Sequence, residues 1–136
     1  MWTHEHSIET AATPARVWKF LADVAQWKKW NAGIEAIEIH GPFAAGTRFT
    51  MKPPGQDAFI STLVEVRRNE SFVDETIVEG VRVLVNHSLI PLPSGRTRIV
   101  YGTEITGPGA ETFGPMVTSD FPDVLAALKR LAEQPE

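Results

Sequence analysis

His87 and Tyr101 are the side chains of this sequence whose types and spacing are best suited to chemistry. Residues 93–95, Pro-Ser-Gly, are typical of a three-residue hairpin loop with glycine in the left-handed position. Such a loop places His87 directly opposite Tyr101 on neighbouring strands. Histidine exchanges a proton near neutral pH, so the pair could assist an enolisation or an aldol-type ring closure. The alternative is a buried hydrogen bond that only satisfies the two groups.

The same register surrounds this pair with apolar side chains, because every second residue of a strand points to the same face. The opposite face carries arginine, asparagine, serine and glutamate, which water solvates. An apolar wall with a few polar groups is typical of a small-molecule site. The C-terminal segment supplies a facing stripe of apolar residues at helical spacing. The predicted ligand-binding residues are Val83, Val85, His87, Leu89, Ile99, Tyr101, Thr103, Phe113, Val117, Phe121 and Val124.

Two aspartates are further candidates for this site. Asp120 falls at the edge of the apolar stripe, and it would serve equally well as the N-cap of a helix that begins there. Asp74 faces the same side as His87 if residues 79–80, Glu-Gly, form a two-residue turn; a slip of one residue would turn it to solvent. The predicted catalytic residues are therefore His87 and Tyr101, with Asp120 beside them.

The remaining polar motifs predict neither a metal nor a cofactor. His4 and His6 share a strand face, but zinc sites usually add a carboxylate or a cysteine nearby. His40 shares its face with Glu38, so we expect it to be solvated. Residues 107–109, Gly-Pro-Gly, lack the third glycine and the strand–helix–strand unit of a dinucleotide loop.

The composition excludes several classes of protein. With 136 residues, of which 43% are hydrophobic and 22% charged, the chain can bury one core, and we expect a single domain over residues 1–136. A net charge of -4 argues against a nucleic-acid partner. The sequence has no cysteine, which excludes disulfides and thiolate catalysis. The polar N-terminus and the lack of about 18 consecutive apolar residues predict neither a signal peptide nor a membrane span, hence a cytoplasmic protein.

The helical spacing of apolar residues and the alternation of polarity in strands predict the elements that position these residues. Thr13 is a good N-cap and Pro14 a good first residue for a short helix. The C-terminal stripe continues through Pro122, so we expect one long helix kinked there; the alternative is a helix that begins near Asp120. Segments of alternating polarity predict strands at 2–10, 34–41, 46–52, 58–66, 71–78, 81–89 and 96–105.

The sequence resembles the polyketide cyclase/dehydrase branch of the START-like (Bet v 1-like) superfamily. The most specific stretch is I-x-x-A-A-x-P-x-x-V-W at residues 8–18, followed by W-x-x-W-N at residues 27–31. The stretches GTRFTM, STLVEV, SGRTRIVYGTEITGP and DVLAALKRLAEQ extend the likeness over nearly the whole chain. The resemblance implies an α+β helix-grip fold. In this fold a bent antiparallel seven-stranded sheet wraps around a long C-terminal helix, a short helical segment follows the first strand, and a deep apolar cavity lies between sheet and helix.

The resemblance also gives the tryptophans a role. In such folds Trp27 and Trp30 lie where the N-terminal helical segment turns into the second strand, and Trp18 lies on the helix itself. We interpret the three as anchors that fix this segment to the sheet. A pocket wall is the alternative, and stacking on nucleic-acid bases is disfavoured by the net charge of -4.

Three functional hypotheses follow from the sequence. Members of the superfamily range from aromatase/cyclases to carriers of lipids, sterols and hormones, so the fold does not decide among them. We prefer a protein that binds a hydrophobic small molecule, polyketide-, lipid- or sterol-like, between sheet and helix. The alternatives are a polyketide cyclase/aromatase-type enzyme that uses the same cavity and a protein-interaction module. A collapsed cavity with an exposed apolar patch would favour the interaction module.

Overall fold

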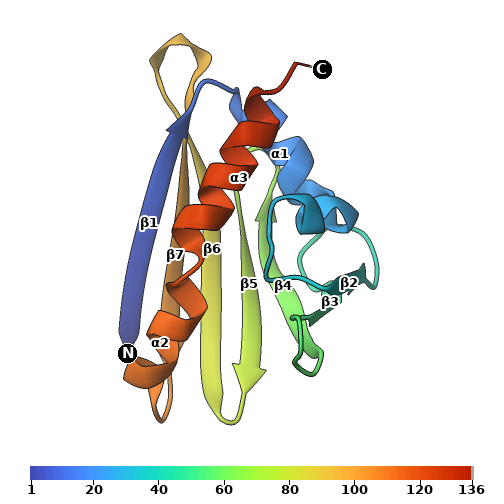
Figure 1. Cartoon of the computed structure of the whole chain (residues 1–136), viewed down its shortest axis with the longest axis vertical. Coiled ribbons are helices and arrows are strands. Elements are labelled where there is room, and N and C mark those ends of the chain that lie inside the picture. The colour runs from blue at the N-terminus through green and yellow to red at the C-terminus, as the bar shows by residue number, and fades with distance from the viewer. Residues whose placement is uncertain (136) are drawn as a thin grey trace.

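The computed structural model describes residues 1–135 of the chain. This part forms an antiparallel seven-stranded sheet in the order β1-β7-β6-β5-β4-β3-β2. Figure 1 shows the sheet bending behind the C-terminal helix, which runs obliquely across its inner face. This is the predicted helix-grip arrangement. The elements are β1 (Trp2–Thr10), α1 (Pro14–Ala22), η1 (Val24–Lys29), β2 (Ala36–Ile39), β3 (Arg48–Lys52), β4 (Phe59–Arg67), β5 (Ser71–Val78), β6 (Val81–Pro91), η2 (Pro93–Gly95), β7 (Thr97–Thr106), α2 (Ala110–Thr118) and α3 (Phe121–Glu133).

The turn between β5 and β6 fixes the register of both strands. Glu79 and Gly80 have φ angles of 51° and 79°, the left-handed pair that a two-residue hairpin turn requires. Val78 therefore pairs with Val81, and Asp74 lies opposite Val85 on the inner face. The two-residue turn predicted from the sequence is confirmed, and with it the inward direction of Asp74.

The loop between β6 and β7 also has the predicted register. The backbone N–H of Leu92 donates to the carbonyl of Arg96 at 2.8 Å, which closes a loop over η2. His87 lies opposite Tyr101, as predicted. The predicted pairs Leu89–Ile99, Val85–Thr103 and Val83–Ile105 are confirmed as well.

The N-terminal helical segment begins and packs as the sequence predicts. The hydroxyl of Thr13 accepts a hydrogen bond from the backbone N–H of Arg16 at 3.2 Å and so caps α1. Trp18, Trp27 and Trp30 expose only 7%, 5% and 4% of their surface. The indole N–H of Trp27 donates to the carbonyl of Leu21 at 2.9 Å, which ties η1 to α1. The prediction that protein atoms bury Trp18 and Trp27 is confirmed.

The C-terminal segment differs from the expected continuous helix. α2 ends at Thr118 and α3 begins at Phe121, so the expectation of one kinked helix is wrong and the alternative holds. Pro122 lies in the first turn of α3, where its missing N–H leaves no hydrogen bond unmade. The apolar stripe continues across the break because both helices pack on the same concave face of the sheet (Figure 1).

The buried residues form two adjacent clusters beneath these two helices. The larger cluster lies beneath α3 and contains His87's neighbours Phe72, Leu89 and Tyr101. The smaller cluster lies beneath α2 and is centred on Val83 and Ile105. None of the helices in the described part of the chain is long and apolar enough to cross a membrane.

Candidate ligand site between the sheet and α3

His87 and Tyr101 meet edge to face in the larger cluster. Their ring centroids are 4.6 Å apart, and the two residues expose only 7% and 4% of their surface. Phe72 of β5 stacks on the imidazole at 3.9 Å with an interplanar angle of 10°. Phe121 of α3 meets the phenol ring edge to face at 5.6 Å. The pair is therefore held between the sheet and the first turn of α3.

Asp74 completes a group of three polar side chains. Its Oδ2 lies 3.7 Å from Nε2 of His87, and both groups are largely buried. The other ring nitrogen, Nδ1, lies 3.3 Å from the backbone carbonyl of Phe72. Because a carbonyl only accepts, this bond assigns the imidazole proton to Nδ1. The lone pair of Nε2 then faces the carboxyl group.

Burial keeps this group largely uncharged. It raises the pKa of Asp74 from 3.8 to about 7. Burial lowers the pKa of His87 from 6.5 to about 3, although the bond to Phe72 acts in the opposite direction. The pKa of Tyr101 is raised by burial first, then by the charges of Asp74 and Asp120. At neutral pH the site thus holds a neutral imidazole, a phenol and a carboxyl close to its midpoint.

Two buried side-chain donors have no partner in the described part of the chain, one of them in this group and one farther along the row of rings. The hydroxyl of Tyr101 and the indole N–H of Trp30 are both shielded from solvent without a hydrogen bond. Buried polar atoms are paired in the great majority of cases, and an unpaired one costs about 1–3 kcal/mol. The sequence led us to interpret Trp30 as an anchor, with a pocket wall as the alternative. The overlooked signal was its N–H, which needs a partner when tryptophan is buried.

The structure divides the predicted lining residues between the two clusters. Those near Tyr101 are His87, Leu89, Ile99, Phe121 and Val124. Val83 and Phe113 belong to the smaller cluster beneath α2, while Val85 and Val117 contact both clusters. The hydroxyl of Thr103 donates to the carbonyl of Leu84 at 2.8 Å, so its one proton is already used and it can only accept from a ligand. The group around Tyr101 is therefore the better candidate site.

Asp120 lies at the rim of this site. Asp120 is exposed at the break between α2 and α3, and its side chain makes no capping hydrogen bond to the N-terminus of α3. Partial loss of water around the carboxyl raises its pKa. A Cβ built on Gly33 would lie 3.4 Å from Oδ2 of Asp120, so the loop before β2 reaches the helix break. Asp120 thus lies near both this loop and Tyr101.

With the fold and its buried polar group described, the chain can be compared with known proteins. The family described as "Polyketide cyclase / dehydrase and lipid transport" matches residues 1–133. The chain belongs to this family. No curated protein matches the chain in sequence.

Solved structures share the fold of this polyketide cyclase/dehydrase family member at low sequence identity. A truncated norcoclaurine synthase from Thalictrum flavum has a TM-score of 0.80 and 18% identity, over 99% of this chain and 95% of that one. The Zhui aromatase/cyclase from Streptomyces sp. R1128 also has a TM-score of 0.80 and 18% identity, over 97% and 93%. A START superfamily protein from Mycobacterium smegmatis has a TM-score of 0.76 and 16% identity, over 97% of each chain. At these identities the likeness shows the fold alone.

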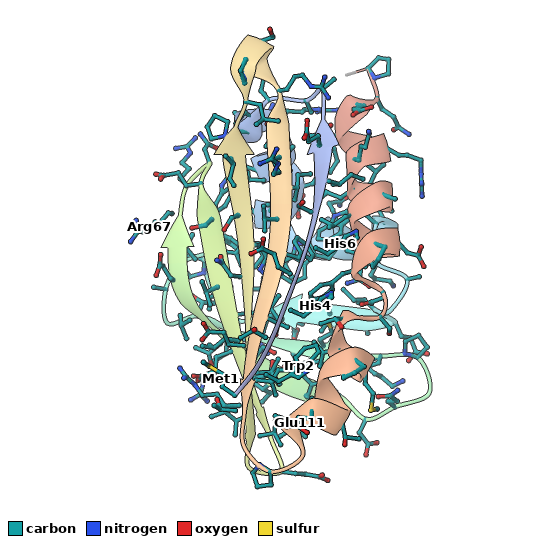
Figure 2. The ribbon with its side chains drawn as sticks, turned by 90° about the vertical axis from the view of Figure 1, so that its left-hand side faces the viewer. Met1, Trp2, His4, His6, Arg67 and Glu111 are labelled. Carbon is teal, nitrogen blue, oxygen red and sulfur yellow. The ribbon has the colours of Figure 1, made fainter. Side chains whose placement is uncertain are left out.

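The histidines of β1 lie on the strand next to β7, where His6 pairs with Tyr101. Figure 2 shows Trp2, His4 and His6 along β1 beside the C-terminal helices. His4 stacks on Trp2 with ring centroids 5.8 Å apart. Within residues 1–135 no cluster of three histidine or acidic side chains has the arrangement of a metal site. The imidazole of His40 is half-exposed and bonds the hydroxyl of Thr50 at 2.7 Å.

The structure does not show an open cavity around Tyr101. A shallow hollow of about 600 Å³ lies mainly on the outer face of the sheet, where Gly102 leaves a gap between Glu5 and Asn86. A second hollow of about 350 Å³ lies at the start of α2. The space beneath α3 is filled by the side chains of the larger cluster. A ligand in this space has to displace some of them.

Proposed function

We propose that the protein binds a hydrophobic small molecule between the sheet and α3, with the polar end of the molecule at Tyr101, His87 and Asp74. The observation that carries this proposal is the buried, unpartnered hydroxyl of Tyr101 on an otherwise apolar wall. A core selected only for stability would pair or remove such a group. A binding site instead leaves it free for the ligand, within apolar walls that supply affinity.

Family membership supports the same proposal. The family is described by polyketide cyclases, dehydrases and lipid transport, which share hydrophobic small molecules as ligands or substrates. Each apolar side chain that packs on the ligand contributes through burial, at about 25 cal/mol per Å². Polyketide-, lipid- and sterol-like molecules are therefore the classes to test.

The test is a titration followed residue by residue. The ¹⁵N-labelled protein is titrated with Nile red, a neutral hydrophobic dye, and amide chemical shifts are recorded. We expect the largest changes in β6, β7 and α3, around Tyr101. Changes centred on the outer hollow at Gly102, or no binding at all, would show that the site is wrongly placed. Native mass spectrometry of the freshly purified protein complements the titration by detecting a ligand that co-purifies.

A cyclase-type enzyme is the second candidate, and the contact between Asp74 and His87 favours it. Acid and base side by side, with pKa values displaced in opposite directions, are typical of proton-transfer sites. In an enolisation, Nε2 of His87 would take the α-proton and the carboxyl of Asp74 would deliver one to the carbonyl oxygen. The imidazolium would then return its proton to Asp74. Deuterium exchange into a β-diketone, measured for the wild type and His87→Gln, tests this candidate.

Two features favour the interaction-module hypothesis. The space beneath α3 is filled, and Ile60 and Val64 of β4 and Ile77 of β5 expose 55%, 41% and 64% of their surface. Three such side chains make a patch smaller than those that mark protein interfaces. An outer interface would also leave the unpartnered hydroxyl of Tyr101 without a role. Ligand binding accounts for more of the structure.

A further inference from the structure

We propose that α2 is a hinged lid over the inner face of the sheet, held shut by the indole ring of Trp2. The lid opens while α3 and the strands stay folded, and it uncovers the part of the inner face that leads to Tyr101. Its role as an entrance rests on the proposed ligand binding, whereas the opening itself is a property of the fold.

The two C-terminal helices are held to the sheet in different ways. The residues that α3 buries have mostly large apolar side chains: Phe121, Val124, Leu125, Leu128 and Ala132. The residues that α2 buries are small: Ala110, Gly114 and Thr118. The end of α3 is also tied to β1, because the carboxylate of Glu133 accepts a hydrogen bond from the hydroxyl of Thr10 at 2.7 Å. A segment that buries little apolar surface opens locally at the lowest cost, so α2 should open before α3 does.

Trp2 is the large side chain that closes on α2. A Cβ built on Gly114 would lie 2.4 Å from the six-membered ring of Trp2, so this ring rests directly on the bare backbone of the helix. Figure 2 shows Trp2 at the start of β1, beside α2. The ring also stacks on His4 and packs on the cluster of Val83 and Ile105. Glycine at position 114 is therefore what allows the ring to close on the helix.

Both ends of α2 have the features of hinges. Gly109, its N-cap, has a φ of 77°, and nothing lies within 4 Å of a Cβ built there. Two residues earlier the chain is fixed, because a Cβ on Gly107 would lie 2.6 Å from the carbonyl oxygen of Gly80 in the β5–β6 turn. At the other end α2 stops at Thr118, and residues 119–120 separate it from α3. The helix can therefore rotate at Gly109 against a fixed base and flex again before α3.

The sequence of α2 weakens the helix from within. Gly114 makes the helical state about fivefold less favourable than alanine would. Pro115 has no N–H to donate to the carbonyl of Glu111, and its ring crowds this carbonyl. The hydroxyl of Thr118 bonds the carbonyl of Gly114 at 3.3 Å, so this bond stays within the helix and does not tie it to the sheet. The helix thus depends on its contact with Trp2 to stay in place.

The lid lies over a path to Tyr101. The smaller cluster around Val83 lies beneath α2. Val85 of β6 and Val117 of α2 contact both clusters, so the inner face continues from one cluster into the other. Val85 pairs with Thr103, which is two residues from Tyr101 and on the same face of β7. An outward movement of α2 removes Val117 and opens this side of the larger cluster.

Hydrogen exchange of the full chain, followed by mass spectrometry, tests the lid without a ligand. We expect the amides of α2 to exchange about 100-fold faster than those of α3, since the two helices open separately. Gly114→Ala should speed exchange in α2 by about tenfold more, because its methyl group displaces the ring of Trp2. Trp2→Ala removes the same contact and should also speed it. Exchange in α3 should not change in either variant. Equal protection of α2 and α3, or faster exchange of both in Gly114→Ala, would show that α2 is not a separate lid.

The two substitutions combined give a sharper test. Without the ring of Trp2, a methyl group at position 114 meets no ring and improves only the helix. In the Trp2→Ala background, Gly114→Ala should therefore slow exchange in α2 by up to about fivefold, the reverse of its effect in the wild type. Met116→Ala is the matched control, since Met116 is 71% exposed on the same helix, and it should change little in either background. An effect of Gly114→Ala with the same sign in both backgrounds would overturn the role of Trp2.

Stopped-flow binding of Nile red tests whether the lid is the entrance. Gly114→Ala should raise the association rate constant by the same factor as the exchange rate of α2, because a lid that must open first limits association. Met116→Ala should bind at the wild-type rate. If the dye binds to none of these proteins, the proposed ligand binding is wrong, while the exchange data still decide whether α2 is a lid. If the dye binds at a rate that does not follow the opening of α2, the lid is not the entrance and this part of the inference is overturned.

Discussion

Nε2 of His87 on β6 faces the carboxyl group of Asp74 on β5 across 3.7 Å, inside the larger buried cluster. The hydrogen bond from Nδ1 of His87 to the carbonyl of Phe72 holds the ring in this orientation. A neutral base therefore lies beside a carboxyl group that burial keeps partly protonated. The two pKa shifts make stability depend on pH in opposite directions. The contribution of Asp74 is lost as the pH rises, and that of His87 is lost as the pH falls.

The first prediction concerns Asp74→Asn. Burial raises the pKa of Asp74 from 3.8 to about 7, so the folded state holds this proton more tightly than the unfolded state. The resulting contribution to the free energy of unfolding is complete below pH 3.8 and is lost as the pH rises through 7. The asparagine has no proton to lose. The stability of Asp74→Asn relative to the wild type should thus increase by about 1 kcal/mol between pH 6 and pH 8. Urea unfolding at both pH values measures it. An unchanged difference between pH 6 and pH 8 would show that Asp74 does not change its protonation in this range.

The second prediction concerns His87→Phe. Burial lowers the pKa of His87 from 6.5 to about 3, so its neutral form contributes fully above pH 6.5, and this contribution is lost as the pH falls towards 3. Phenylalanine keeps the stacking on Phe72 and has no such loss. Between pH 7 and pH 5 the variant should gain about 2 kcal/mol relative to the wild type.

The same variant tests the contribution of His87 to binding. His87→Phe should keep the fold and its affinity for an oxygen-free hydrocarbon such as anthracene, while discrimination in favour of an oxygenated ligand such as Nile red decreases. A site that hydrogen-bonds its ligand discriminates more sharply than an apolar one. Paired titrations of wild type and variant measure the ratio of the two affinities. An unchanged ratio would show that His87 does not contribute to the discrimination.

The third prediction concerns Trp27, which stacks on Phe72 and meets Phe49 edge to face at 5.4 Å. Trp27→Ala should lower the free energy of unfolding by about 3–5 kcal/mol, as large-to-small changes in a core do. Trp27→Phe keeps a ring but loses the hydrogen bond to the carbonyl of Leu21, and should cost less. Denaturant unfolding measures both variants. An unchanged stability of Trp27→Ala together with lost ligand binding would make Trp27 a pocket wall instead of an anchor.

The sequence predicted the parts of the fold that local chemistry determines. Gly80 and Gly95 lie in tight turns with positive φ, and these turns set the registers that place Asp74, His87 and Tyr101 on one face. Once the turn lengths are known, the alternation of side chains along each strand decides which face of the sheet each residue occupies. The anchoring of Trp27 was implied by the family resemblance, and its burial agrees with the cost of exposing a large aromatic side chain.

The parts that the sequence did not predict depend on packing between distant segments. The stripe of apolar residues through Pro122 is the same for one kinked helix and for two helices, and only the docking of α2 on the smaller cluster separates the alternatives. The missing partner of the indole N–H of Trp30 likewise depends on which groups surround it in three dimensions. The resemblance implied a deep cavity beneath α3, and the sequence does not show how closely the side chains pack there, so the filled space was not predicted.

The last prediction concerns the way a ligand reaches this filled space. Asp120 at the α2–α3 break lies next to Gly33 in the loop before β2, and its charge raises the pKa of Tyr101, so this contact lies close to the phenol. We expect the loop and the break to separate when a ligand enters. Gly33→Cys together with Asp120→Cys introduces a cysteine on each side of this contact, since a Cβ at position 33 would lie 3.4 Å from Oδ2 of Asp120. A short bis-maleimide cross-linker or direct oxidation then ties the loop to the break. The sequence has no other cysteine to compete. Stopped-flow binding of Nile red should be slowed at least tenfold in the oxidised protein and restored by dithiothreitol, whereas each single-cysteine variant should bind at the wild-type rate. Equal rates in the oxidised and reduced forms, with the disulfide verified by mass spectrometry, would show that the ligand enters elsewhere.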